Sequence, residues 1–161
     1  MATPRPLAAR ASGPGWGATP RFGFPWRDLV ASVQAAVPSY ARILLVEDDP
    51  ALRTALCEAL EESGYEVACA ADGQDALAQL GARPAPSLIL LDLAMPVMDG
   101  WSFRAAQRKD PRLAAIPTIV LSATIAMDPR ALDGLEPAAA LAKPFDLDRL
   151  IATVQRVCVP C

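Results

Sequence analysis

The chain has 161 residues, of which 53% are apolar and 20% are charged, a composition typical of one ordinary globular domain. Residues 1–40 carry a net charge of +3 and residues 41–161 a net charge of −6, so the acidic part is a poor partner for a phosphate backbone and we expect no direct nucleic-acid binding. The absence of histidine excludes a histidine general base, a histidine metal ligand and a phospho-acceptor histidine.

Residues 1–40 form an extension rich in Pro, Gly, Ala and Arg. This composition does not support a packed core, so we expect disorder, within which residues 26–37 could form a short amphipathic helix. The extension has no apolar segment of a secretory signal, and no run of about 18 apolar residues occurs in the chain. We therefore expect a cytoplasmic protein without a membrane span. The role of the extension stays open between an interaction tail and a leader without function.

From residue 41 onward, apolar runs alternate with helix signals. The runs predict strands over residues 42–46, 65–69, 88–92, 117–122 and 138–142. Cap residues, proline and glycine predict helices from Asp49-Pro50 to Gly64, from Asp72 to Gly81, from near Gly100, from Asp128-Pro129 and from Asp146, with a long connection over residues 111–116. This alternation predicts an α/β fold, a doubly wound, flavodoxin-like (βα)5 parallel sheet with strand order 2-1-3-4-5 over residues 41–158, followed by a tail over residues 159–161.

Four of the predicted strands lead into polar side chains at the same edge of the sheet. Glu47 and Asp48 follow the first strand, Asp92 ends the third, Ser122 ends the fourth and Lys143 follows the fifth. The first and third strands are neighbours in the order 2-1-3-4-5, so their carboxylates should converge at the point where open α/β sheets place their ligands.

Converging carboxylates need a cation, because two unit charges about 4 Å apart repel by roughly 4 kcal/mol at an effective dielectric constant of about 20. A set of oxygen ligands favours Mg²⁺ over Zn²⁺. With a lysine and a hydroxyl beside it, the cluster predicts a phosphoryl site in which Asp92 attacks phosphorus and forms an acyl phosphate. Each residue also has a simpler reading: a helix cap for Asp48 and Asp49, a strand-end hydroxyl for Ser122, and a surface charge for Lys143. Those readings leave the convergence unexplained.

The sequence resembles the receiver domains of two-component response regulators over about residues 41–158. The resemblance rests on four motifs in order: ILLVEDDP at 43–50, LDLAMPVMDG at 91–100, VLSA at 120–123 and KPF at 143–145. It implies Asp92 as the phospho-acceptor and a cis peptide between Lys143 and Pro144. It further implies Mg²⁺ bound by Asp48, Asp92 and the backbone carbonyl of Ala94, with Glu47 acting largely through water, Ser122 as the switch hydroxyl and Lys143 on the phosphoryl group.

The same resemblance implies a signalling role for the chain. The phosphoryl group would come from a phosphohistidine on a sensor histidine kinase or a histidine phosphotransfer protein, and the signal would pass to a downstream protein target or to a further phosphoryl acceptor. The protein would act as a stand-alone receiver similar to the chemotaxis-type single-domain regulators. It would be no enzyme beyond catalysing its own phosphorylation and dephosphorylation.

One position departs from the family pattern. Receivers usually carry Tyr or Phe three residues before the lysine, and here that residue is Ala140. This departure leaves open a pseudo-receiver that binds partners without switching. A further alternative is a phosphatase of the haloacid-dehalogenase type. Such phosphatases usually have a second acid two residues after the nucleophile, and because this chain has Ala94 there, it offers no general acid for turnover. If Asp92 is phosphorylated, we expect the signal to leave through a modified fourth helix and fifth strand.

The four cysteines are too few and too scattered to predict a disulfide framework. Cys57 and Cys69 fall in apolar patterns, which favours reduced thiols that fill the core. Cys158 and Cys161 form a Cys-x-x-Cys pair near the last residue of the sequence, without a second pair of ligands. For this pair we expect fraying or adventitious oxidation in preference to a redox or metal site.

Overall fold

Five parallel strands form one sheet in the order β2-β1-β3-β4-β5, so the predicted fold class is confirmed. The computed structural model describes residues 41–158. The predicted extension over residues 1–40, with its helix near 26–37, and the tail over 159–161 lie outside the described residues. The strands are β1 (Arg42–Val46), β2 (Glu66–Ala70), β3 (Leu88–Asp92), β4 (Thr118–Ser122) and β5 (Ala139–Ala142).

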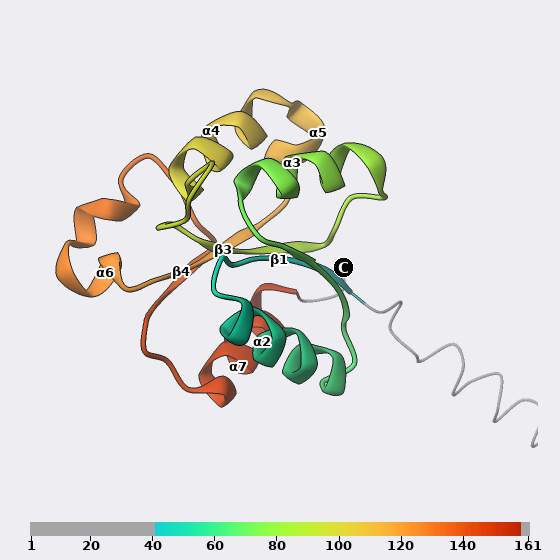
Figure 1. The fold of residues 1–161 in the computed structure, drawn as a ribbon, viewed down its shortest axis with the longest axis vertical. Coiled ribbons are helices and arrows are strands. Elements are labelled where there is room, and N and C mark those ends of the chain that lie inside the picture. Colours follow the sequence, from blue (N-terminus) through green and yellow to red (C-terminus); the bar gives the residue numbers. More distant parts are fainter. Residues whose placement is uncertain (1–40, 159–161) are drawn as a thin grey trace, which may run out of the picture. The chain divides into compact units, whose positions relative to one another are not determined.

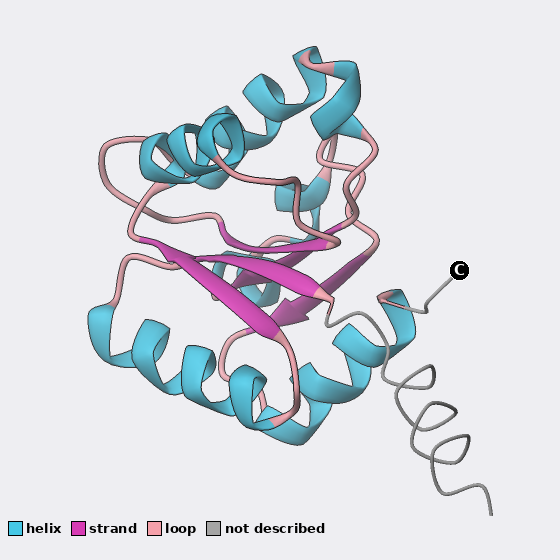
Figure 2. Ribbon diagram, turned by 90° about the vertical axis from the view of Figure 1, so that its right-hand side faces the viewer, coloured by secondary structure: helices cyan, strands magenta, loops and turns pink. Residues whose placement is uncertain are grey.

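Helices cover both faces of this sheet (Figures 1 and 2). One face carries α2 (Pro50–Glu62) and α7 (Leu147–Val157), and the other carries α3 (Gly73–Ala82), α4 (Gly100–Lys109) and α5 (Pro111–Ala114). After β4 the chain forms α6 (Thr124–Met127) and the 3-10 helix η1 (Pro129–Leu132). Among the described residues, no helix combines the length and the apolar character that crossing a membrane requires.

The central strands are buried on both faces. All residues of β3 and β4 are buried, and β1 is buried from its second residue. Successive side chains of a strand point to opposite faces, so Ile43 and Leu45 pack into the cluster that contains α2 and α7 side chains, whereas Leu44 and Val46 pack into the cluster that contains α3 and α4 side chains. Because each face of the sheet packs into its own hydrophobic core, these strands carry runs of consecutive apolar residues and not an apolar residue at every second position only.

Aspartates occupy the N-cap positions of most helices, and the sequence predicts Asp49, Asp72 and Asp146 among them. Asp49 accepts hydrogen bonds from the first-turn amides of α2, Asp72 does the same for α3, and Asp99 accepts from the amide of Ser102 in α4. Asp146 occupies the N-cap position of α7 but makes no side-chain cap hydrogen bond. The cap signals therefore locate the helix starts, and the fold decides which of the hydrogen bonds form.

Several element boundaries differ from the prediction, among them the starts of β4 at Thr118 and β5 at Ala139, each one residue later than expected. The connection over 111–116 contains α5, which Asp110 caps. The fourth helical segment begins at Thr124 and is split, so that only η1 follows Asp128. The α3 helix does not end at Gly81 but continues through it to Ala82. The second strand begins one residue later than expected, at Glu66.

The expectation of reduced thiols at Cys57 and Cys69 is wrong, because the structure joins the two residues in a disulfide. Cys57 lies on α2 and Cys69 on β2, and α2 packs on β2. Both side chains also pack against the larger core cluster, as predicted. Cys158 is a free thiol, and burial raises its pKa. The sequence could not predict the pairing, since it depends on how a helix lies across a strand.

Candidate functional site

The carboxylates predicted to converge do lie together at the carboxyl ends of the strands. In the register of β1 and β3, Val46 is opposite Leu91, so the next residues, Glu47 and Asp92, leave neighbouring strands side by side. Glu47, Asp48 and Asp92 can each offer a carboxylate oxygen, with all three oxygens within 4.8 Å of one another. Glu47 is 1% and Asp92 5% exposed, so two of the three acids are withdrawn from water.

Lys143 bridges the two buried acids. Its Nζ donates to Glu47 Oε2 at 2.7 Å and to Asp92 Oδ2 at 2.9 Å. The position of this ammonium follows from the end of β5, where the Lys143 amide donates to the Ser122 carbonyl at 3.1 Å. The peptide between Lys143 and Pro144 is cis, which confirms the expectation taken from the family.

Backbone amides fix the orientation of the Asp92 carboxylate. Oδ1 accepts hydrogen bonds from the amide of Leu93 at 2.6 Å and from that of Ala94 at 3.3 Å, while Oδ2 faces Lys143. Both Asp92 oxygens thus have partners within the protein. Three donors therefore fix the position of this buried carboxylate.

Burial and charge oppose each other in this cluster. Burial raises the pKa of Glu47 above its ordinary value, although the hydrogen bond from Lys143 acts against the rise. Burial lowers the pKa of Lys143, but its hydrogen bonds to Glu47 and Asp92 outweigh this effect and leave the pKa raised. Three carboxyl groups face one ammonium, so acidic groups outnumber the lysine. The oxygen donors and this excess of acidic groups both suit Mg²⁺.

Ser122 ends the strand next to β3 and is completely buried. Asp92 is opposite Leu121 in the register of β3 and β4, so Ser122 lies one residue beyond, at the edge that holds the acids. Its Oγ accepts a hydrogen bond from the Thr124 amide at 3.2 Å. The hydroxyl proton is left to donate to another acceptor.

Arg53 is a site residue that the sequence reasoning missed. Its Nη1 donates to the Glu47 carbonyl at 2.6 Å and to the Asp48 carbonyl at 3.2 Å. The guanidinium therefore ties the loop that presents both acids to the first turns of α2. The signal that could have found Arg53 is its position one turn after the cap Asp49.

Asp49 and Ala94, two further residues named in the sequence analysis, lie beside the acid cluster. Asp49 is exposed and accepts from the amides of Ala51 and Leu52, so it acts as the helix cap that we preferred. These two hydrogen bonds are the main reason that the pKa of Asp49 is lowered. Ala94 lies in the loop after β3, with its amide on Asp92. The predicted role of the Ala94 carbonyl stays a prediction.

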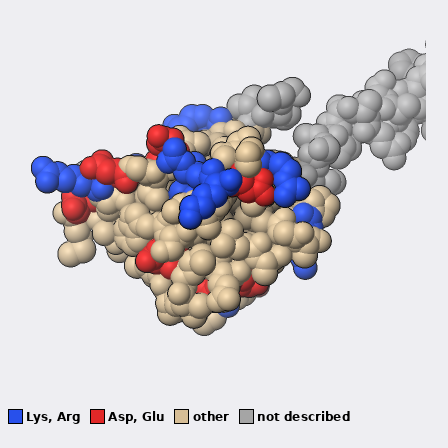
Figure 3. Space-filling model, turned by 90° about the horizontal axis from the view of Figure 1, so that it is seen from above, with Lys and Arg blue, Asp and Glu red and all other residues tan. Residues whose placement is uncertain are grey.

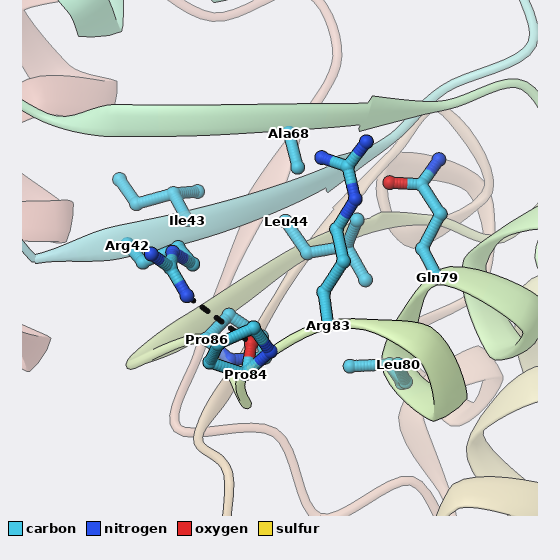
Figure 4. Close-up of a pocket in the computed structure, with 9 residues that line it drawn as sticks. All are labelled: Arg42, Ile43, Leu44, Ala68, Gln79, Leu80, Arg83, Pro84 and Pro86. Atoms are coloured by element: carbon cyan, nitrogen blue, oxygen red, sulfur yellow. Dashed lines mark hydrogen bonds between the residues drawn. The ribbon is translucent and has the colours of Figure 1, made fainter.

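A hollow lies away from the acids (Figure 4). It is lined by residues of β1, β2, α3 and the segment after α3, with Arg42, Gln79 and Arg83 among apolar neighbours. Arg42 begins β1 and pairs with Glu66, which begins β2. The hollow therefore opens near the amino-terminal edge of the sheet, opposite the acids, and plays no part in their chemistry.

Residues 43–155 match the family model described as response regulator receiver domain. A curated relative, the response regulator receiver protein CpdR of Brucella abortus, is 39% identical over 119 residues, which cover 73% of this chain and 97% of that protein. The DNA-binding dual master transcriptional regulator RpaA of Synechocystis is 37% identical over 116 residues, covering 71% of this chain and 47% of that protein. The chain thus spans about half the length of RpaA and of several other curated relatives.

Solved structures show the same similarity. The chemotaxis protein CheY4 of Vibrio cholerae superposes with a TM-score of 0.68 at 32% identity, covering 74% of this chain and 99% of that one. The receiver domain of the sensor histidine kinase PA1611 of Pseudomonas aeruginosa gives the same TM-score and identity and covers 74% of this chain and 98% of that one. That structure is described with a magnesium ion coordinated in the active site cleft.

Proposed function

Because this chain belongs to the response-regulator receiver family, we propose that it is the phosphorylatable receiver of a two-component phosphorelay, with Asp92 as the phospho-acceptor. The observation that carries the proposal is the contact of Lys143 with both Glu47 and Asp92 at 2.7 and 2.9 Å. A buried acid cluster that is held by one lysine at the carboxyl edge of a parallel sheet is arranged for chemistry on a phosphoryl group.

In the proposed reaction, an Asp92 carboxylate oxygen attacks the phosphorus of a phosphohistidine. The new O–P bond forms as the P–N bond breaks, and the electron pair of that bond stays on the imidazole nitrogen of the donor. Lys143 moves its hydrogen bond from the Asp92 carboxylate to a phosphoryl oxygen, and the Ser122 hydroxyl donates to another. The amides of Leu93 and Ala94 hold the Asp92 side chain in place during the attack.

Asp48 and Asp92, together with the Ala94 carbonyl, would hold Mg²⁺, and Glu47 would act largely through water. When bound, the ion neutralises the phosphoryl oxygens as charge develops on them. The fit of these residues to Mg²⁺ rests on their oxygen atoms and on the excess of acidic groups over lysine in the cluster.

The proposal also covers domain limits, partners and location. The receiver domain is placed over residues 41–158, around the family match at 43–155. The donor is a sensor histidine kinase or a histidine phosphotransfer protein, the target is a protein, and the compartment is the cytoplasm. The only catalysis proposed is that of its own phosphorylation and dephosphorylation.

The test uses the full chain with Mg²⁺ and phosphoramidate, a small donor with the P–N bond of phosphohistidine. Intact mass should rise by one phosphoryl group, and hydroxylamine, which cleaves acyl phosphates, should remove it. Asp92→Asn should abolish the gain. Asp99→Asn is the matched control, because Asp99 caps α4 seven residues later and Asn caps a helix equally well.

Two results would contradict the proposal. A mass gain that survives in Asp92→Asn would place the phosphoryl group elsewhere. No gain in the wild type, with phosphoramidate or with acetyl phosphate, would favour the non-switching pseudo-receiver, which the alanine at position 140 already suggests. Steady release of product from a generic phosphoester would instead favour the phosphatase.

A further inference from the structure

One side of α4 holds the chain segment that leads into β5. Trp101, Arg104 and Arg108 are spaced three and four residues apart, so they lie on the same side of the helix. Each of the three donates hydrogen bonds to backbone carbonyls of residues 131–136. The bonds are Trp101 Nε1 to Ala131 O at 2.9 Å, Arg104 Nε to Leu135 O at 3.0 Å, Arg104 Nη2 to Glu136 O at 3.3 Å and Arg108 Nη1 to Gly134 O at 2.7 Å.

Arg104 is unusual among these donors because it is 7% exposed. Its hydrogen-bond partners are neutral: the two carbonyls and Gln107 Oε1, which accepts from Nη1 at 2.8 Å. Gln107 is itself completely buried and donates to carbonyls at the start of the connection to β4. A buried guanidinium is costly unless it is fully hydrogen-bonded, so this arrangement ties α4 tightly to residues 135 and 136.

Arg108 makes a different kind of contact. It pairs with the exposed carboxylate of Glu136 at 2.7 Å, and such surface pairs contribute little to stability. Figure 3 looks onto the side of the molecule that carries α3, α4 and α5 and shows basic side chains there next to acidic ones. The hydrogen bonds of Trp101 and Arg104 are therefore the main contacts that hold residues 131–136 on α4.

The first residue of the same helix contacts the backbone next to Asp92. The Gly100 amide donates to the Leu93 carbonyl at 2.9 Å, and a Cβ at Gly100 would collide with the Asp92 carbonyl oxygen. Leu93, which follows Asp92 directly, packs in a small buried cluster with Trp101, Leu135 and Ala140. Residues next to the phospho-acceptor and residues of the 131–136 segment thus contact the same helix and the same cluster.

We propose that α4 carries the signal of Asp92 phosphorylation to residues 131–136, with Trp101 doing the work that most receivers give to an aromatic residue of β5. This inference rests on the proposed function. The small side chain of Ala140 faces the cluster in which Trp101 packs, so the aromatic group comes from α4 and not from the strand. A movement of the loop after Asp92 shifts Leu93 and Gly100, and the hydrogen bonds of Trp101 and Arg104 transmit it.

The test compares amide hydrogen exchange of the full chain with and without beryllofluoride and Mg²⁺, which together mimic the phosphoryl group. In the wild type, exchange at residues 131–136 should change by about fivefold or more. Trp101→Phe removes the indole donor and one of the two fused rings while keeping an aromatic side chain, and Arg104→Met removes the guanidinium while keeping an unbranched side chain. Both should lose most of this change. Arg112→Gln is the control, because Arg112 is exposed and, among residues 41–158, pairs with Asp110 alone.

Phosphorylation is measured on the same samples by intact mass with phosphoramidate. No mass gain in the wild type would refute the proposed function, and this inference with it. A mass gain without altered exchange at 131–136 would refute the inference alone. So would altered exchange that persists in Trp101→Phe and Arg104→Met. Since Trp101→Phe is a mild substitution, its result decides the question if Arg104→Met does not fold.

Discussion

Lys143 and Glu47 are 96 residues apart in the chain, yet the ammonium of Lys143 lies 2.7 Å from Glu47 Oε2. The glutamate is almost completely buried and the lysine side chain is 19% exposed. The same ammonium reaches Asp92. Removing or titrating one of the three groups therefore changes the electrostatic environment of the other two.

Glu47→Gln should stabilise the protein in the absence of Mg²⁺ and weaken Mg²⁺ binding. Burial raises the pKa of Glu47, so its carboxylate is less stable in the folded protein than in water. A gain of about 1 kcal/mol would raise Tm by roughly 4 °C for a domain of this size. Thermal unfolding with and without Mg²⁺ measures both effects. An unchanged or lower Tm without Mg²⁺ would show that Lys143 fully compensates the buried charge.

The stabilising effect of Lys143 should disappear at alkaline pH. Its hydrogen bonds to Glu47 and Asp92 raise its pKa above the ordinary 10.5, even though burial lowers it. A raised pKa in the folded state means that the stabilisation is fully present below about pH 10.5 and is lost as pH rises through the folded value. Urea unfolding between pH 9 and 12 should show a fall in stability that is absent in Lys143→Met.

Lys109 is the matched control for that experiment, because it is the only other lysine in the chain. It is exposed near the end of α4, and Lys109→Met should keep the alkaline fall in stability. If the alkaline fall in stability is absent in Lys109→Met as well as in Lys143→Met, general charge repulsion in the protein would explain the fall, and the site would not.

Gly100→Ala should destabilise the domain and disturb the site. A Cβ there would collide with the Asp92 carbonyl oxygen and would lie 2.8 Å from Leu93 Cα. Both atoms belong to the backbone and cannot move aside cheaply, so we expect a loss of about 1–3 kcal/mol. Chemical denaturation measures the loss, and intact mass after treatment with phosphoramidate measures the effect on Asp92.

Gly81→Ala is the opposite case and serves as the control. Gly81 lies within α3, and a Cβ there meets no atom within 4 Å. Alanine in a helix is better than glycine by roughly 0.5–1 kcal/mol, so this variant should be more stable than the wild type. A destabilised Gly81→Ala would contradict the helical conformation of that residue.

Arg53→Gln should lower the affinity for Mg²⁺ without preventing folding. The guanidinium holds the carbonyls of Glu47 and Asp48, and a loop that is less fixed presents its carboxylates less accurately. Groups that position metal ligands typically contribute about 10–100-fold in affinity. Calorimetric titration with Mg²⁺ measures the loss, and Arg53→Lys should recover part of the affinity. Equal affinity in all three proteins would show that the loop is held by other contacts.

Much of the fold could be predicted because its signals are local. Continuous apolar runs indicate strands with two buried faces, and Asp49, Asp72 and Asp99 mark helix starts by a cap that needs only the next few residues. The segment from Thr124 to Leu132 was predicted less well. Its two short helical pieces pack against each other, and α6 also packs against β5, so propensity alone does not fix such short helices.

The buried polar residues of α4 show where sequence reasoning failed. Arginine is almost never fully buried unless it is paired, so nothing in the sequence marked Arg104 as an interior residue. Its partners are backbone carbonyls 31 and 32 residues away, and every residue has a carbonyl. Only the packing of α4 against residues 131–136 selects which carbonyls are free to accept.

The sequence alone determined the sheet, its strand order and the edge at which Glu47, Asp48, Asp92, Ser122 and Lys143 gather, because periodicity, caps and the parallel topology follow from short-range patterns. The tertiary structure decided that Lys143 contacts both buried acids, that Arg53 holds their loop and that Trp101 packs beside Ala140. It also decided that Cys57 pairs with Cys69. Each of these contacts joins residues of different elements or loops, and the distances between them are set only when the elements pack.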